Sequence, residues 1–232
     1  MASRSHLIDW PDTAKPSFAS WALGFLLILV AAPLFGETLL VVWPSVFREN
    51  GLIETPQMAL LGLSAILFAH ALVRSSGARA VFSAVLILAC LLALQREIPA
   101  CESAFYEGGI CATRPAKAVF AVGAGTICAL VLLLKHAPWR RVVDLGNILW
   151  VWPVALAAVL LGLAELAEHR ILVEIEETLE LGAYLYLALF ATGMAFRSPD
   201  VAIRDVRSVR RVAAAPRSRD ANKPGTLPET TG

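Results

Sequence analysis

Two short segments each place three polar side chains at helical spacing: Glu165, Glu168 and His169, and then Glu177, Glu180 and Tyr184. Residues three and four apart project from the same face of a helix. Because few residues separate the two segments, their polar faces can oppose each other. Carboxylates crowded together in a low-dielectric setting repel, so they must hold protons, bind a cation or pair with arginine. Three hypotheses about function follow.

The first hypothesis is cation or proton binding linked to transport, with Glu37, Glu165, Glu168, Glu177 and Glu180 as the candidate ligands. A helix needs roughly 20 residues to cross the apolar layer of a membrane. The last apolar run must therefore begin near Glu177, which places Glu180 about one turn inside. Glu37 is followed by ten uncharged residues and is also expected below the surface. Ionisable side chains within a membrane are usually turned inward and functional.

The second hypothesis is a metal-dependent membrane enzyme that acts on a lipid or a polyprenyl-linked substrate. A divalent cation, the one candidate cofactor, would be held by Glu165, Glu168 and His169 and would activate water. This pattern is close to, but differs from, a zincin helix and the Glu-x-x-His pair of di-iron bundles. For His169 the alternative is an ordinary interfacial histidine. The chain contains no Gly-rich phosphate loop and no nucleophile elbow, so the sequence leaves open whether it is an enzyme.

The third hypothesis is a structural or assembly subunit of a membrane complex. Here arginines would neutralise the acids in an ion-pair network, for which the candidates are Arg96, Glu97, Glu54 and Arg170. The expected partners are the lipid bilayer and other membrane subunits. The formal net charge is only +1 and its charges are segregated along the chain, and nucleic acid is not an expected partner.

Four cysteines fall into two classes. Cys90 and Cys128 lie within apolar runs, where a small hydrophobic residue is the ordinary explanation. Cys101 and Cys111 flank a connection that contains two glycines, and their spacing permits a hairpin closed by a disulfide. We therefore predict a Cys101–Cys111 bond.

The elements that must position these residues are apolar helices. Of the 232 residues, 57% are hydrophobic and 17% are charged, with a mean hydropathy of +0.66, so the main solvent of the chain is not water. The uncharged runs are Phe18–Gly36, Thr55–Val73, Ala80–Gln95, Ala118–Leu134, Asn147–Ala164 and Leu181–Phe196. Continuous runs of this length predict an all-α, polytopic membrane protein with a bundle of six transmembrane helices.

The basic residues set the expected orientation. Fifteen of the twenty Lys and Arg residues fall in the two termini and in the connections that would share their side of the membrane. By the positive-inside rule, both the N and the C terminus are predicted to be cytoplasmic. Twelve of the nineteen acids fall on the opposite side or in the outer half of the spans. The predicted location is the cytoplasmic (inner) membrane.

Three regions follow from this reading. Residues 1–17 are expected to form a cytoplasmic N-terminal lead, residues 18–197 the six-span domain, and residues 198–232 a disordered basic cytoplasmic tail. Within the fourth run, Gly123 and Gly125 are expected to give a small-residue face for close helix contact. Four tryptophans are expected in the aromatic belts of the membrane interfaces, namely Trp43, Trp139, Trp150 and Trp152.

Overall fold

A computed structural model describes residues 16–43, 53–103, 111–137, 139–168, 170 and 172–196, without the side chains of Arg141 and Glu168. The predicted lead, apart from its last two residues, and the predicted tail at 198–232 lie outside the described residues. Within these ranges the elements are all helices, and the one β-type feature is an isolated bridge between Ala100 and Ala112.

Six long helices correspond in order to the six apolar runs: α1 (Phe18–Val42), α2 (Glu54–Val73), α3 (Gly77–Glu97), α4 (Arg114–Leu134), α7 (Trp152–Glu168) and α8 (Val173–Phe196). The short helices α5 (Trp139–Val142) and α6 (Leu145–Ile148) lie between α4 and α7. Of the described helices, α1 to α4 and α8 are long and apolar enough to cross a membrane, whereas α7 has 17 residues. The all-helical prediction is confirmed, with five candidate spans.

Two helix boundaries differ from the apolar runs. Helix α1 continues past Gly36 and Glu37 to Val42, because one charged residue does not end a helix when apolar residues resume after it. Helix α7 begins at Trp152 and not at Asn147, which lies in α6. Pro153 is thus in the first turn of α7, where its missing amide hydrogen costs no intrahelical bond.

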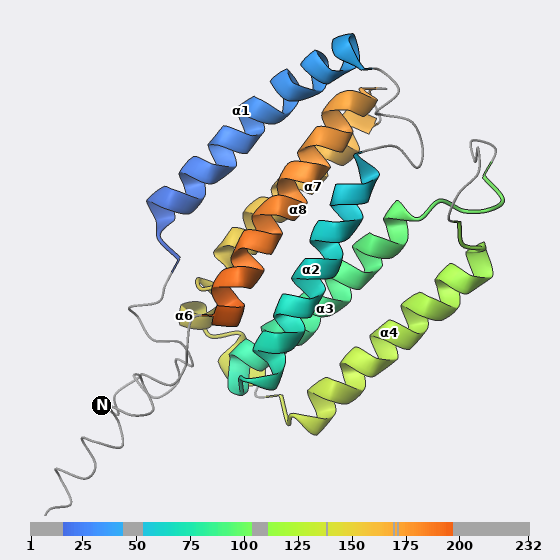
Figure 1. Cartoon of the computed structure of the whole chain (residues 1–232). Helices are drawn as coiled ribbons and strands as arrows, with labels where there is room; N and C mark the ends of the chain where they lie inside the picture. The colour runs from blue at the N-terminus through green and yellow to red at the C-terminus, as the bar shows by residue number, and fades with distance from the viewer. Residues whose placement is uncertain are drawn as a thin grey trace, which may run out of the picture. The chain divides into compact units, whose positions relative to one another are not determined.

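Helix α8 is the central element of the bundle. It packs against α1, α2 and α7, while α2 also packs against α3, and α3 contacts α4 (Figure 1). Buried apolar side chains fill these interfaces: Phe68, Phe190 and Met194 belong to one cluster, and Leu160 and Leu179 to a second. By contrast, none of the residues of α4 is buried. The core therefore lies among α2, α3, α7 and α8, with α1 against α8.

Tryptophan placement departs from the expected interfacial belts at one position. Trp150 is only 3% exposed and packs in the first of the two core clusters, so it is a core residue. Trp43 and Trp139 are exposed. Trp152 stacks on Phe18, with 5.1 Å between ring centroids.

Close helix contact occurs at glycines other than the predicted pair. A Cβ added to Gly36 would lie 2.6 Å from the carbonyl oxygen of Glu174, and one added to Gly182 would clash with Ile28. Both contacts join α1 to α8. Gly123 and Gly125 have no described atom within 4 Å of an added Cβ, so the small-residue face predicted there makes no close contact among the described residues.

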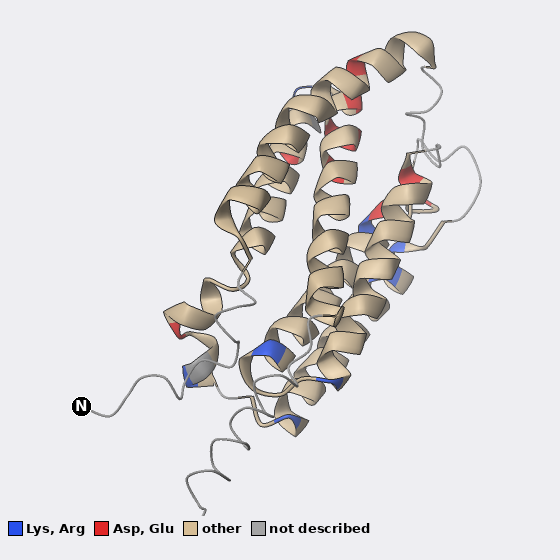
Figure 2. Cartoon of the chain, turned by 60° about the vertical axis from the view of Figure 1, so that its left-hand side comes forward, with Lys and Arg blue, Asp and Glu red and all other residues tan. Residues whose placement is uncertain are grey.

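Acidic residues gather at one end of the long helices, whereas basic residues occur at both ends (Figure 2). We call one end the acidic end; its carboxylates are Glu37, Glu54, Glu97, Glu165, Glu174, Glu176, Glu177 and Glu180. The other, the basic end, carries Arg74, Arg79, Lys135 and Arg140. At the basic end the side chain of Arg79 donates a hydrogen bond from Nη2 to the carbonyl oxygen of Met194, which links α3 to α8. Successive long helices run in opposite directions, so the acids meet at one end although they are far apart in sequence (Figures 1 and 2).

Candidate functional site

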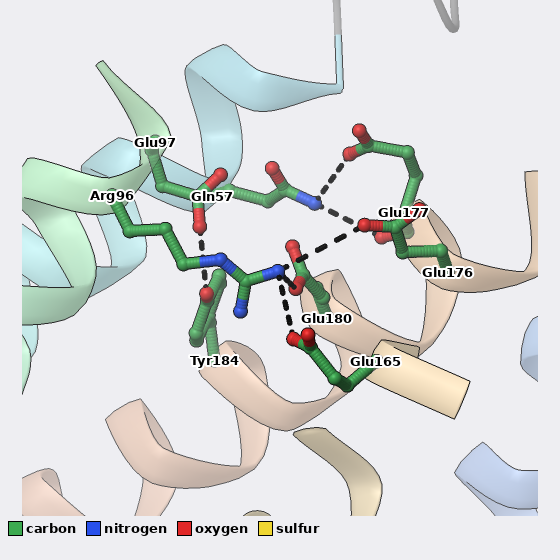
Figure 3. Close-up of polar contacts among 8 residues, drawn as sticks. All are labelled: Gln57, Arg96, Glu97, Glu165, Glu176, Glu177, Glu180 and Tyr184. Carbon is green, nitrogen blue, oxygen red and sulfur yellow. Dashed lines mark hydrogen bonds and ion pairs between the residues drawn. The ribbon is translucent and has the colours of Figure 1, made fainter. Parts of the chain in front are cut away.

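Arg96, in the last turn of α3, is the centre of a cluster of carboxylates at the acidic end (Figure 3). Its Nη2 lies 2.9 Å from Oε1 of Glu180, 3.5 Å from Oε2 of Glu165 and 3.9 Å from Oε1 of Glu176. Glu165 comes from the end of α7, and the other two come from the first turns of α8. One guanidinium thus joins three helices.

The three ion pairs differ in how far water reaches them. The side chain of Glu180 is 4% exposed and that of Glu176 12%, whereas Glu165 is 52% and Arg96 46% exposed. Exposed ion pairs are screened and contribute little. Burial of Glu180 removes most of its solvation, so Arg96 matters most to this carboxylate. All three distances are measured to the same nitrogen, which carries only two hydrogens.

Tyr184 fixes a second carboxylate. Its hydroxyl donates a hydrogen bond of 2.7 Å to Oε1 of Glu97, the residue that follows Arg96. Tyr184 is 2% exposed and lies one helical turn after Glu180. Two members of the predicted polar line on α8, Glu180 and Tyr184, therefore face the end of α3.

Gln57 fixes a third carboxylate, and the sequence analysis did not identify it. Its Nε2 donates to Oε2 of Glu177 at 2.9 Å and to the backbone carbonyl of Glu177 at 3.0 Å. Gln57 lies one turn into α2 and has no exposed surface. An amide within an otherwise apolar run was the available signal, because such a side chain needs partners once it is buried.

The remaining candidate ligands and ion-pair partners differ in whether they lie near the cluster. Glu54, half-buried at the start of α2, is within electrostatic range of Glu177. Glu37 is on the exposed side of α1 and makes no described contact with the cluster, so its part in cation binding stays a prediction. Arg170 is also exposed and forms no ion pair among the described residues. Lys117 of α4 is a second cation, besides Arg96, within electrostatic range of Glu97.

The metal hypothesis falls largely on residues that are not described. The side chain of Glu168 and all of His169 lie outside the described residues, so the predicted triad with Glu165 stays a prediction. Among the described residues, no group of three or more His, Cys, Asp or Glu side chains has an arrangement that could hold a metal ion.

A disulfide lies close to the cluster along the chain. Cys101 and Cys111 are joined, with their Cα atoms 5.0 Å apart. Two backbone hydrogen bonds flank the bond, from Cys101 N to Ala112 O and from Ala112 N to Pro99 O. The crosslink connects the end of α3, with Arg96 and Glu97, to the start of α4.

No protein-family model, curated protein or solved structure matches this chain. Helices α2, α3, α7 and α8 bring five carboxyl groups, one guanidinium, one amide and one phenol together (Figure 3). Such a group of side chains can bind positive charge, or it can hold four helix ends together.

Proposed function

We propose that the protein binds a cation or a proton at the Arg96 cluster and that this binding is linked to transport across a membrane. We propose further that the chain spans the cytoplasmic membrane six times, with α7 as the shortest span and both termini in the cytoplasm. The acidic end then faces outward. This orientation rests on the distribution of Lys and Arg along the sequence.

The observation that carries the proposal is the imbalance of charge around a buried carboxylate. Glu97, Glu165, Glu176, Glu177 and Glu180 surround a single guanidinium. If all five ionised, four negative charges would remain within the cluster, partly in a low-dielectric setting where repulsion is strong. Binding of positive charge relieves that repulsion, and Glu180 would benefit most because it is buried most deeply.

Flux measurements in proteoliposomes test the proposal. The purified protein is expected to move protons or another small cation down an imposed gradient, and Glu180→Gln is expected to abolish this flux without unfolding the protein. Glu37→Gln, at the exposed face of α1, serves as the matched control and should retain the flux. Equal flux in the wild type and in Glu180→Gln would reject the assignment.

A structural role is the second candidate, and one observation favours it. The contacts described in the cluster join different helices: Gln57 links α2 to α8, and Arg96 links α3 to α7 and α8. In this case the charges would stabilise the bundle or hold a neighbouring subunit, with no flux at all. Loss of a co-purifying subunit in Arg96→Gln, in a protein that is inactive in proteoliposomes, would support it.

A further inference from the structure

Gln57 has a buried acceptor that its known contacts do not satisfy. Both hydrogen bonds of its amide use Nε2, and the two acceptors both belong to Glu177. They fix the orientation of the amide, since a flipped amide would set its oxygen against two other oxygens. Oε1 of Gln57 then has no hydrogen-bond partner among the described residues, although the side chain is completely buried. A buried acceptor left without a donor is costly and points to a missing donor.

Glu180 also has a buried oxygen without a hydrogen bond. Its Oε1 also lacks a hydrogen bond of acceptable geometry among the described residues, although Arg96 Nη2 lies only 2.9 Å away. The contact is therefore an ion pair without a well-directed hydrogen bond. Side chains of a helix point back over the preceding turn, which directs the carboxyl of Glu180 toward Glu177 and its partner Gln57. Figure 3 shows the carboxyl of Glu180 beside Arg96, with its second oxygen on the side of Gln57, whose amide oxygen is turned away from it.

Charged and titratable groups approach Glu180 from several helices. Helix α3 contributes Arg96 and Glu97, helix α7 contributes Glu165, and α8 itself contributes Glu176, Glu177 and Tyr184. Helix α2 contributes the neutral Gln57. Helix α1 also packs against α8, but its one acid, Glu37, is on its exposed side. The surroundings of Glu180 are thus acidic, with Arg96 as its one described ion-pair partner.

We infer that Glu180 carries the transported proton and that the amide oxygen of Gln57 accepts the hydrogen bond of the protonated carboxyl through one water molecule. This inference rests on the proposed function and narrows its ligand to a proton. A proton needs only one or two acceptors, whereas Na⁺ or a divalent cation requires a shell of several oxygens. No described group of acidic side chains is arranged to hold a metal.

The step is simple in its chemistry. A proton from water binds one oxygen of the Glu180 carboxylate, which then becomes a hydroxyl donor toward the water molecule between it and Oε1 of Gln57. The charge of the carboxylate is lost, so its ion pair with Arg96 is lost too. On release the proton returns to water, and the carboxylate pairs with Arg96 again. Gln57 is a positioning residue here, since it neither gains nor loses a proton.

Infrared spectroscopy on the full chain in lipid nanodiscs tests this inference without any need for transport. Lowering the pH should raise a carboxylic-acid carbonyl band that Glu180→Gln removes. Gln57→Leu should shift that band to higher frequency, because the protonated carboxyl loses its acceptor. Gln95→Leu is the control. It replaces the other glutamine of the chain, which precedes Arg96 near the end of α3, and it should leave the frequency of the band unchanged. Thermal unfolding of each variant verifies that it is folded.

Three outcomes would overturn the inference. The first is a carboxylic-acid band that persists in Glu180→Gln, or that is absent from the wild type over the whole pH range. The second is a band that Gln57→Leu leaves at its original frequency. The third is loss of the band when NaCl replaces choline chloride at constant pH, since a metal ion would then occupy the position. Flux without the Glu180 band would reject this inference alone, whereas the band without flux would reject the proposed transport and leave only proton binding at Glu180.

Discussion

Replacement of Arg96 by glutamine is expected to destabilise the bundle because it leaves Glu180 buried without its counter-charge. Breaking a buried ion pair costs about 3–5 kcal/mol, whereas an exposed pair contributes about 0–1 kcal/mol. In this pair the side chain of Glu180 is 4% exposed and that of Arg96 is 46% exposed. The pair is buried at one end only, and we expect Arg96→Gln to lower the free energy of unfolding by about 2 kcal/mol.

A double-mutant cycle separates this effect from a general loss of packing. Free energies of unfolding would be measured in mixed micelles for Arg96→Gln, Glu180→Gln and the double variant. The double variant should lower the free energy of unfolding by less than the sum of the two single variants, because neither charge is then left without its partner. Arg170→Gln, at an exposed arginine without a described ion pair, is the control. Additive effects, or an Arg96 variant no weaker than the Arg170 control, would refute the reasoning.

Two further predictions concern the contact between α1 and α8 and the orientation of the chain in the membrane. Gly36→Ala should lower the free energy of unfolding by about 1–3 kcal/mol, since its Cβ would meet the backbone of α8. Gly193→Ala is the control, because an added Cβ has no described atom within 4 Å, and it should leave the free energy of unfolding unchanged. Equal free energies of unfolding for the two variants would contradict the close contact between α1 and α8. Separately, a membrane-impermeant maleimide added to intact cells after reduction should label Cys101 and Cys111; labelling only after the cells are opened would place the acidic end inside.

The sequence predicted the helices well because the apolar runs are long and their boundaries are chemically sharp. Helix α2 starts one residue before its predicted run, and both end at Val73. The errors arose where a boundary depends on something other than charge. A single acid, Glu37, ends the uncharged run but not the helix, and α7 begins at Trp152, with Pro153 in its first turn, although the apolar run begins at Asn147.

Helical spacing also predicted much of the site, but not its pairing. The line of Glu177, Glu180 and Tyr184 follows directly from steps of three and four residues, and its approach to Arg96 follows from the antiparallel order of the helices. The partner of each polar side chain on α8 depends on the rotation of α2 and α3 about their own axes. That rotation is set by packing of the apolar faces, which a nearly uniform apolar run does not encode. The sequence therefore does not predict that Gln57 is the partner of Glu177.

The two candidate functions require different properties of the same guanidinium. A structural clamp gains most when arginine grips one carboxylate with two parallel hydrogen bonds, because such a pair is directional and strong. Around Arg96, three carboxylates converge on Nη2 at distances from 2.9 to 3.9 Å, and the nearest lacks a well-directed hydrogen bond. Carboxylates that share one nitrogen can exchange it at little cost when one of them is neutralised. Loss of charge at Glu180 would then release Nη2 to Glu165 or Glu176, so a proton bound on α8 would change the contact between α3 and α7. In the proposed function, this coupling would link the binding of a proton on α8 to the packing of α3 against α7.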